Sequence, residues 1–168
     1  MPCRSLCFRW CWMSRRVDLV APRPGDCEYL AANLRAADVA EVEASTGRTD
    51  MLAVIRTSVD ASLYCWSAVD QDGRLVAMLG VVPADLLGGL GVPWMLGTDL
   101  VEQQQRALVR LSRAYIPRML ETFPRLVNFV DARNERAVRF LRHAGFYIAK
   151  AEPHGPLGLP FHPFIMKA

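Results

Sequence analysis

The pattern of apolar and polar positions in residues 17–63 predicts one strand followed by three short helices. A β-type run over 17–21 is closed by two prolines, which end a strand. From Asp26 the pattern predicts two short helices that break near residue 35, with Asp38 as N-cap of the second and Glu41 as its capping-box partner. A third helix is predicted within 50–63, where four apolar residues recur at near-helical spacing: Met51, Val54, Ile55 and Val59.

Residues 63–99 have the pattern of three antiparallel strands. Two β-rich runs meet at the turn Gln71–Gly73, whose Asp-Gly pair is the clearest hairpin signal in the chain. A glycine-rich loop then leads to a third apolar run over 94–99. This part of the chain is therefore expected to form a meander.

Helix and strand alternate in the last third of the chain. Asn134 is the predicted N-cap of a short helix, and Gly145 is the residue that ends it. The predicted elements are, in order, a long helix 101–121, a strand 125–131, a helix 134–144, a strand 146–152 and a last strand 161–168. Together with the meander, this order indicates an α+β fold with one antiparallel half and one βαβ half.

Length and charge limit the class of protein. At 168 residues, 52% of them hydrophobic, the chain is long and apolar enough for one domain with a buried core. The formal net charge is +3, but four of the 20 basic residues lie in residues 1–16, and the other 16 stand against 17 acidic ones. We therefore expect no nucleic-acid partner. The longest apolar stretch, 75–98, contains Asp85 and five glycines, so no membrane span is expected either.

Residues 1–16 are predicted to be a leader outside a single domain over 17–168. Cys3, Cys7 and Cys11 would share one helical face, but their spacing is not a standard zinc pattern and no histidine accompanies them, so no metal site is expected. The leader is expected to be unstructured, or to be a misassigned extension with Met13 as the start. Five cysteines, mostly in the leader, do not make a disulfide framework and indicate a reducing, cytoplasmic setting.

The element order and the late segment of the chain resemble the acyl-CoA N-acyltransferase superfamily, known as GNAT. Asn134 and Ala137, followed by Gly145-Phe146, match the "N-x-x-A…GF" segment of that family. Within it, the chain looks closest to the phage GNAT-like family that includes internal virion protein A of short-tailed phages. Five blocks in order carry this second resemblance: "LRAADVAEVEAS", "DGRLVAMLGV", "GVPWMLGTD", "LSRAYIPRML" and "LVNFVDARNERAVRFLRHAGF".

The resemblance implies a GNAT-like α+β fold with an acetyl-CoA site. Its central sheet would be mixed, mostly antiparallel and six- to seven-stranded, flanked by helices and splayed between strands 94–99 and 125–131. In that fold the pantetheine arm pairs with the first of these strands, and amides at the start of the next helix receive the pyrophosphate. Carried onto this chain, the cofactor-binding residues are Leu96, Gly97, Thr98, Gln103, Gln104, Arg106 and Asn134.

Two departures from the family pattern weaken the implied chemistry. The glycine-rich phosphate turn is replaced by "TDLVEQQQRAL", in which Glu102 puts negative charge where the pyrophosphate would lie. Leu141 stands where many members have a tyrosine that protonates the leaving thiolate. Tyr147 and Asp99 are weak candidates for acid and base, with Glu102 as an alternative base, although Asp99 is better explained as the N-cap of the long helix. Asn134 is likewise expected to act mainly as the N-cap of the last helix, whatever else it contacts.

Basic residues gather in the second half of the domain. Residues 106–143 contain nine arginines and three acids. Arg106, Arg110 and Arg113 would share one face of the long helix, where they would either meet CoA phosphates or form a solvated face, and we favour the solvated face. The three histidines have no metal spacing and are expected on the surface or in loops.

Two hypotheses of function follow from the resemblance. In the favoured one, a phage-encoded GNAT-fold protein with a degenerate acyl-CoA site acts in virion assembly or as an internal virion component. A phage structural protein or a host protein would be its partner, and it would be found in the host cytoplasm or with the virion. In the alternative, the protein is an active acetyl-CoA-dependent N-acetyltransferase that modifies an unknown amine.

Overall fold

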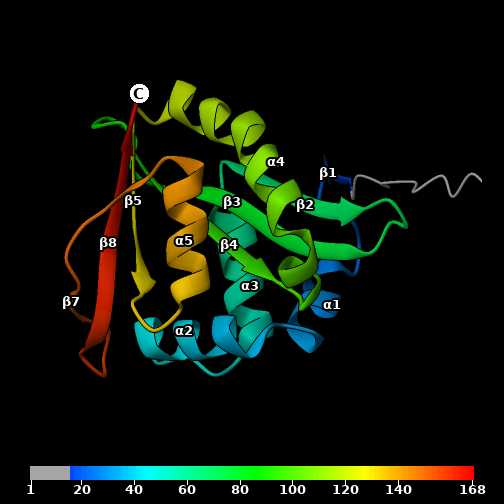
Figure 1. The fold of residues 1–168 in the computed structure, drawn as a ribbon, viewed down its shortest axis with the longest axis horizontal. Coiled ribbons are helices and arrows are strands. Elements are labelled where there is room, and N and C mark those ends of the chain that lie inside the picture. Colours follow the sequence, from blue (N-terminus) through cyan, green and yellow to red (C-terminus); the bar gives the residue numbers. More distant parts are fainter. Residues whose placement is uncertain (1–15) are drawn as a thin grey trace, which may run out of the picture.

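Eight strands form one mixed sheet in the computed structural model, which describes residues 16–168 (Figure 1). The predictions for the three leader cysteines and Met13 lie outside the described residues. The elements are β1 (Val17–Val20), α1 (Asp26–Ala32), α2 (Ala36–Thr46), α3 (Met51–Ala61), β2 (Tyr64–Asp70), β3 (Leu75–Asp85), β4 (Leu90–Gly97), α4 (Leu100–Thr122), β5 (Arg125–Asp131), α5 (Glu135–Ala144), β6 (Tyr147–Ile148), β7 (Glu152–His154) and β8 (Leu159–Lys167). The α+β fold and the antiparallel meander of β2, β3 and β4 are confirmed.

The sheet divides into two halves at one short parallel junction. Its strand order is β1-β2-β3-β4-β5-β8-β6, and β7 pairs with the free part of β8. All neighbours are antiparallel except β4 and β5, which pair only at Leu90–Arg125 and Gly91–Leu126. Beyond Gly91 the two strands diverge, and this confirms the predicted splay. The short β6 and β7 bring the strand count to eight, above the predicted six to seven.

Helices cover both faces of the sheet. One apolar cluster packs α4 and α5 against it, with Leu108, Phe123 and Leu126 almost fully buried. A smaller cluster packs α1 and α3 on the other face around Leu30 and Ile55. Figure 1 shows α2 lying across the end of the sheet where β5 ends and α5 begins. The helix α2 therefore lies at the open end of the gap between β4 and β5.

Local side-chain chemistry sets several helix ends. The Ala53 amide donates to Asp50 at the start of α3, and the Ala137 amide donates to Asn134 at the start of α5. Gly145 ends α5 with φ 100°, a left-handed conformation that glycine adopts without steric cost. These ends match the boundaries expected from sequence.

Three sequence predictions about elements were wrong in detail. Asp38 is not an N-cap, because α2 begins after Arg35 and Asp38 is buried in its first turn. The strand expected over 146–152 is only two residues long, and β8 begins before the expected 161. Between β6 and β7 the regular pairing with β8 is interrupted, although the Ala149 amide still donates to the Pro163 carbonyl of β8.

Candidate functional site

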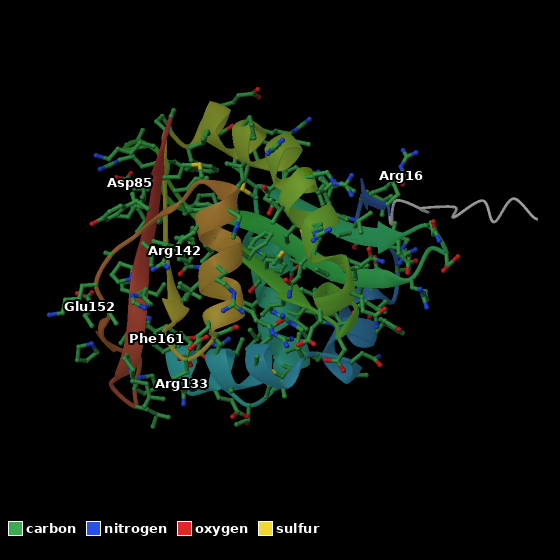
Figure 2. The ribbon with its side chains drawn as sticks, viewed as in Figure 1. Arg16, Asp85, Arg133, Arg142, Glu152 and Phe161 are labelled. Carbon is green, nitrogen blue, oxygen red and sulfur yellow. The ribbon has the colours of Figure 1, made fainter. Side chains whose placement is uncertain are left out.

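A cavity of about 340 Å³ lies in the splay between β4 and β5. Its apolar wall includes Pro93, Trp94, Met95, Leu96, Phe129 and Phe140. Its polar lining includes Arg35, Asp38, Glu41, Asn128, Asn134 and His154. Side chains of α2, α3 and α5 join the two strands around this cavity, and Figure 2 shows the lining residue Phe161 on β8 near the end that α2 covers.

The edge of β4 that faces the cavity is open at one position. The Thr98 amide donates to the Val76 carbonyl of β3, so alternation turns the backbone groups of Gly97, Met95 and Pro93 toward the splay. The Pro93 carbonyl accepts a hydrogen bond from Asn128 Nδ2 at 2.9 Å. Met95 lies beyond the end of the pairing between β4 and β5, so its backbone N–H and C=O face the cavity.

A buried ion pair holds the end of this edge. Arg35 and Asp38 contact each other at 2.5 Å, and both side chains are less than a tenth exposed. Asp38 Oδ2 also accepts from the Gly97 amide at 2.8 Å, and the Gly97 carbonyl accepts from the Arg35 amide at 3.0 Å. Burial raises the pKa of Asp38, and Arg35 and the Gly97 amide act against that shift. Both backbone polar groups of Gly97 are therefore hydrogen-bonded to residues at the start of α2.

Glu41 is a carboxylate of the cavity lining that forms no ion pair within the described part of the chain. Its Oε2 accepts from Asn134 Nδ2 at 3.0 Å, which links α2 to the first turn of α5. Burial raises the pKa of Glu41 to about 7; the Asn134 hydrogen bond opposes this shift, and the charges of Asp38 and Asp131 add to it. A carboxylate with this pKa exchanges protons near neutral pH.

The start of α4 offers few free amides to a phosphate group. The Leu100 amide donates to Thr98 Oγ1, and the Val101 and Glu102 amides donate to the carbonyls of Thr98 and Asp99. A Cβ on Gly97 would lie 2.3 Å from Val101 Cγ2, so Val101 fills the space behind this turn. Glu102 forms an ion pair with Arg136 of α5. Side chains rather than amides are thus the groups left for contacts with phosphate here.

The predicted cofactor-binding residues divide into three groups. Leu96 and Asn134 line the cavity. Gly97 and Thr98 are buried next to it, with their polar groups used as described above. On α4, Gln103 and Arg106 are exposed, and Gln104 is buried with no partner for its Oε1 among the described residues. None of the three α4 residues lines the cavity.

The two weak catalytic candidates lie outside the cavity lining. Tyr147 is 70% exposed on β6. Asp99 is exposed at the N-cap position of α4, but its side chain makes no capping hydrogen bond there, and Thr98 provides one instead. Leu141, which replaces the family's tyrosine, does line the cavity.

Two polar residues of the cavity lining, Glu41 and His154, are not predicted as site residues from the sequence. Glu41 was considered only as part of a capping box, and His154 was expected in a loop or at the surface. His154 instead lies on β7, where its ring stacks on Phe129 with centroids 4.0 Å apart. His162 is also half-buried, on β8. The spacing of Glu41 one turn after Asp38 is the only signal in the sequence that would have placed Glu41 in the same site.

Neither a metal cluster nor a disulfide is found among residues 16–168. No group of three or more His, Cys, Asp or Glu side chains in this range is arranged to hold a metal ion. Cys27 and Cys65 are free thiols, and burial raises the pKa of Cys65 to about 11. In the same range no helix is long and apolar enough to cross a lipid bilayer.

Glu41 should make the stability of the protein depend on pH. Its pKa is raised from 4.5 to about 7 in the folded state, so its stabilising contribution is complete below pH 4.5 and is lost as pH rises through 7. The Glu41→Gln variant keeps an acceptor for Asn134 and cannot ionise. Its unfolding free energy relative to wild type should rise by about 3 kcal/mol between pH 4.5 and 8.5. Urea unfolding at both pH values measures this; a pH-independent difference would contradict it.

No protein-family model and no curated protein sequence matches the chain. Solved structures do match. A protein described as an acetyltransferase, from Acinetobacter baylyi, is 14% identical with a TM-score of 0.69, covering 94% of each chain. The spermidine N-acetyltransferase of Vibrio cholerae, in complex with CoA and spermine, is 12% identical with a TM-score of 0.64 over 90% of this chain and 95% of its own. The dodecameric form of that enzyme, in an intermediate state, gives 13% and 0.61 over 90% and 94%.

None of these similar structures is of a phage virion protein, so the closer resemblance to internal virion protein A stays a prediction. Likeness at such low identity concerns the fold. The mixed eight-stranded sheet, its splay and its flanking helices agree with that likeness. The chain has the fold of the GNAT acetyltransferases.

Proposed function

We propose that the protein is an acyl-CoA-dependent N-acyltransferase that joins a thioester and an amine in the cavity between β4 and β5. The observation that supports this most directly is Glu41, a carboxylate inside the cavity with a pKa of about 7 and a hydrogen bond to Asn134. A general base works best when its pKa lies near the working pH. We assign this role to Glu41.

The reaction balances with the groups present. An amine that binds as an ammonium first gives one proton to Glu41, which returns it to solvent. The neutral nitrogen then attacks the thioester carbonyl, a C–N bond forms and the C–S bond breaks. Glu41 takes the second proton that the nitrogen loses and returns it to solvent, and the leaving thiolate takes a proton from solvent. Leu141 cannot supply that proton. A CoA thiol is acidic enough to leave as a thiolate, so the larger demand falls on the base.

The thioester end of acyl-CoA fits this structure better than the phosphate end. The open backbone of Met95 offers a donor and an acceptor to the pantetheine amides, in the manner of an added strand. At α4 the first amides have internal partners, so phosphate contacts would come from exposed side chains such as Arg106. We therefore propose acetyl-CoA as the donor, bound mainly through its pantetheine arm.

Acetyl-CoA titration by calorimetry, followed by a panel of amines, tests the proposal. At 100 times the dissociation constant, free acetyl-CoA should stabilise the fold by about 2.7 kcal/mol. Hydrogen exchange at the Met95 amide should slow, because the pantetheine would pair with it. Since one similar structure contains spermine, polyamines belong in the panel. Absence of both binding and turnover would contradict the proposal.

A second candidate keeps the fold without catalysis. In it the protein is a phage-encoded component of virion assembly, with a phage structural or host protein as partner. The partnered amides of α4 and the occupied backbone of Gly97 favour this candidate, since both reduce cofactor contacts. Specific co-purification with assembled particles, together with no turnover on the amine panel, would support it over acyl transfer.

A further inference from the structure

The cavity lining points to a class of amine. We infer that the acceptor is a primary monoamine with an aromatic or branched apolar body, and that polyamines are poor acceptors. This inference rests on the proposed acyl transfer and concerns only the charge and shape of the acceptor. It separates the chain from the spermidine acetyltransferases that share its fold.

The charge of the lining accommodates one cation. Four titratable side chains line the cavity, of which Arg35 and Asp38 neutralise each other in a buried ion pair. Glu41 is the carboxylate that remains, and its hydrogen-bond partner Asn134 is neutral. His154 adds no negative charge. An ammonium group beside Glu41 is therefore balanced, and a second one would lie in the cavity without a partner.

The charged residues just outside the lining leave this balance unchanged. Asp131 ends β5 close enough to Glu41 for its charge to act on that carboxylate. Arg133 forms a 2.5 Å ion pair with Asp131, so the two charges offset each other. Neither side chain lines the cavity. Glu41 therefore remains the group that an ammonium in the cavity would meet.

The walls around Glu41 suit an apolar body. Phe129 and His154 stack with their rings 13° from parallel, and the Phe161 ring lies 5.2 Å from His154 between centroids. Trp94 adds a further flat face, with its indole N–H donating to Ser62 Oγ. Rings of this kind pack against aromatic and branched side groups.

Polyamines gain little from this lining. Spermidine carries several cationic amines along a flexible chain, so binding it here would either bury an unpaired cation or leave most of the molecule in solvent. A monoamine of the 2-phenylethylamine type buries its whole body and places its single cation at Glu41. The expected difference in affinity is about tenfold or more in favour of the monoamine, since one desolvated, unpaired cation costs at least this much.

Calorimetric titration of amines into the protein saturated with CoA, which carries no acyl group, measures amine affinity without turnover and tests the inference. We expect 2-phenylethylamine and isopentylamine to bind at least about tenfold more tightly than spermidine. Glu41→Gln should weaken 2-phenylethylamine binding by about tenfold or more, because its ammonium group loses its counter-charge. A spermidine affinity equal to or above that of 2-phenylethylamine would overturn the inference. Acyl transfer to spermidine but not to monoamines would overturn it while leaving the proposed function intact, whereas absence of transfer to every amine would count against the function itself.

A gained carboxylate provides a second, independent test. Ser58 of α3 lines the cavity, and Ser58→Asp adds a second negative charge to the lining. Cadaverine, a diamine, should then bind about tenfold more tightly relative to 2-phenylethylamine than it does in wild type. Thr57→Asp is the matched control, because Thr57 is exposed on the same helix and outside the lining. The same shift in both variants, or none in Ser58→Asp when it is folded by circular dichroism, would overturn the charge argument.

Discussion

Replacing Glu41 with glutamine should lower the rate of acyl transfer by about a hundredfold or more, the usual effect of losing a general base. Glutamine still accepts the hydrogen bond from Asn134, so the cavity keeps its shape while the proton acceptor is lost. In wild type, kcat/KM should rise with pH through about 7 as Glu41 loses its proton. In the variant this rise should disappear.

The pH profile of kcat/KM between about 5.5 and 9 is the measurement, with Glu43→Gln as control. Glu43 lies on the same helix and does not line the cavity, so its variant should keep both the rate and the rise near neutral pH. A Glu41→Gln enzyme that retains the wild-type rate would remove Glu41 from the mechanism.

The second large effect is expected on stability. Asp38→Ala should lower the unfolding free energy by about 3–5 kcal/mol, the typical loss when one partner of a buried ion pair is removed. The variant leaves the Arg35 guanidinium buried without its counter-charge, and it takes away the acceptor of the Gly97 amide. Urea unfolding at neutral pH measures the loss.

The double variant Arg35→Met/Asp38→Leu separates charge from packing. Since apolar residues of similar volume often replace a buried ion pair at little cost, it should recover most of the stability lost in Asp38→Ala. A loss below about 1 kcal/mol in the single variant would mean that water reaches the pair and screens it, as at exposed sites.

The parts of the fold that the sequence predicted well have local causes. Asn134 and Gly145 bound α5 through contacts within a few residues, and the meander follows from alternation and an Asp-Gly turn. β7 was missed and the start of β8 misplaced because Pro153 and Pro160 argue against strands, yet they pair with each other at the sheet edge. Such pairing depends on tertiary neighbours that local pattern does not contain.

The candidate site also contains residues that the sequence predicted and residues that depend on tertiary contacts. Leu96 and Asn134 were placed in it through the family resemblance, and both line the cavity. Glu41 was missed because its partner Asn134 is 93 positions away, and its raised pKa depends on burial, which local pattern does not reveal. His154 was misplaced for a related reason, since its stacking on Phe129 needs β7 to return beside β8.

The position of α2 has a mechanical consequence for the whole sheet. Past Gly91, within the part of the chain that the structure describes, β4 and β5 are joined directly by the hydrogen bond that Asn128 donates to Pro93. A second link runs through α2, whose Asp38 holds β4 and whose Glu41 holds the start of α5. Asp38 and Glu41 lie one helical turn apart, about 4.5 Å along the axis of α2. Through their two hydrogen bonds they set the separation of the two halves of the sheet, whose strands β4 and β5 are paired only up to Gly91. One turn of α2 therefore fixes the distance between β4 and the start of α5 at the cavity. One residue inserted into that turn would rotate Glu41 away from Asn134 and break this second link.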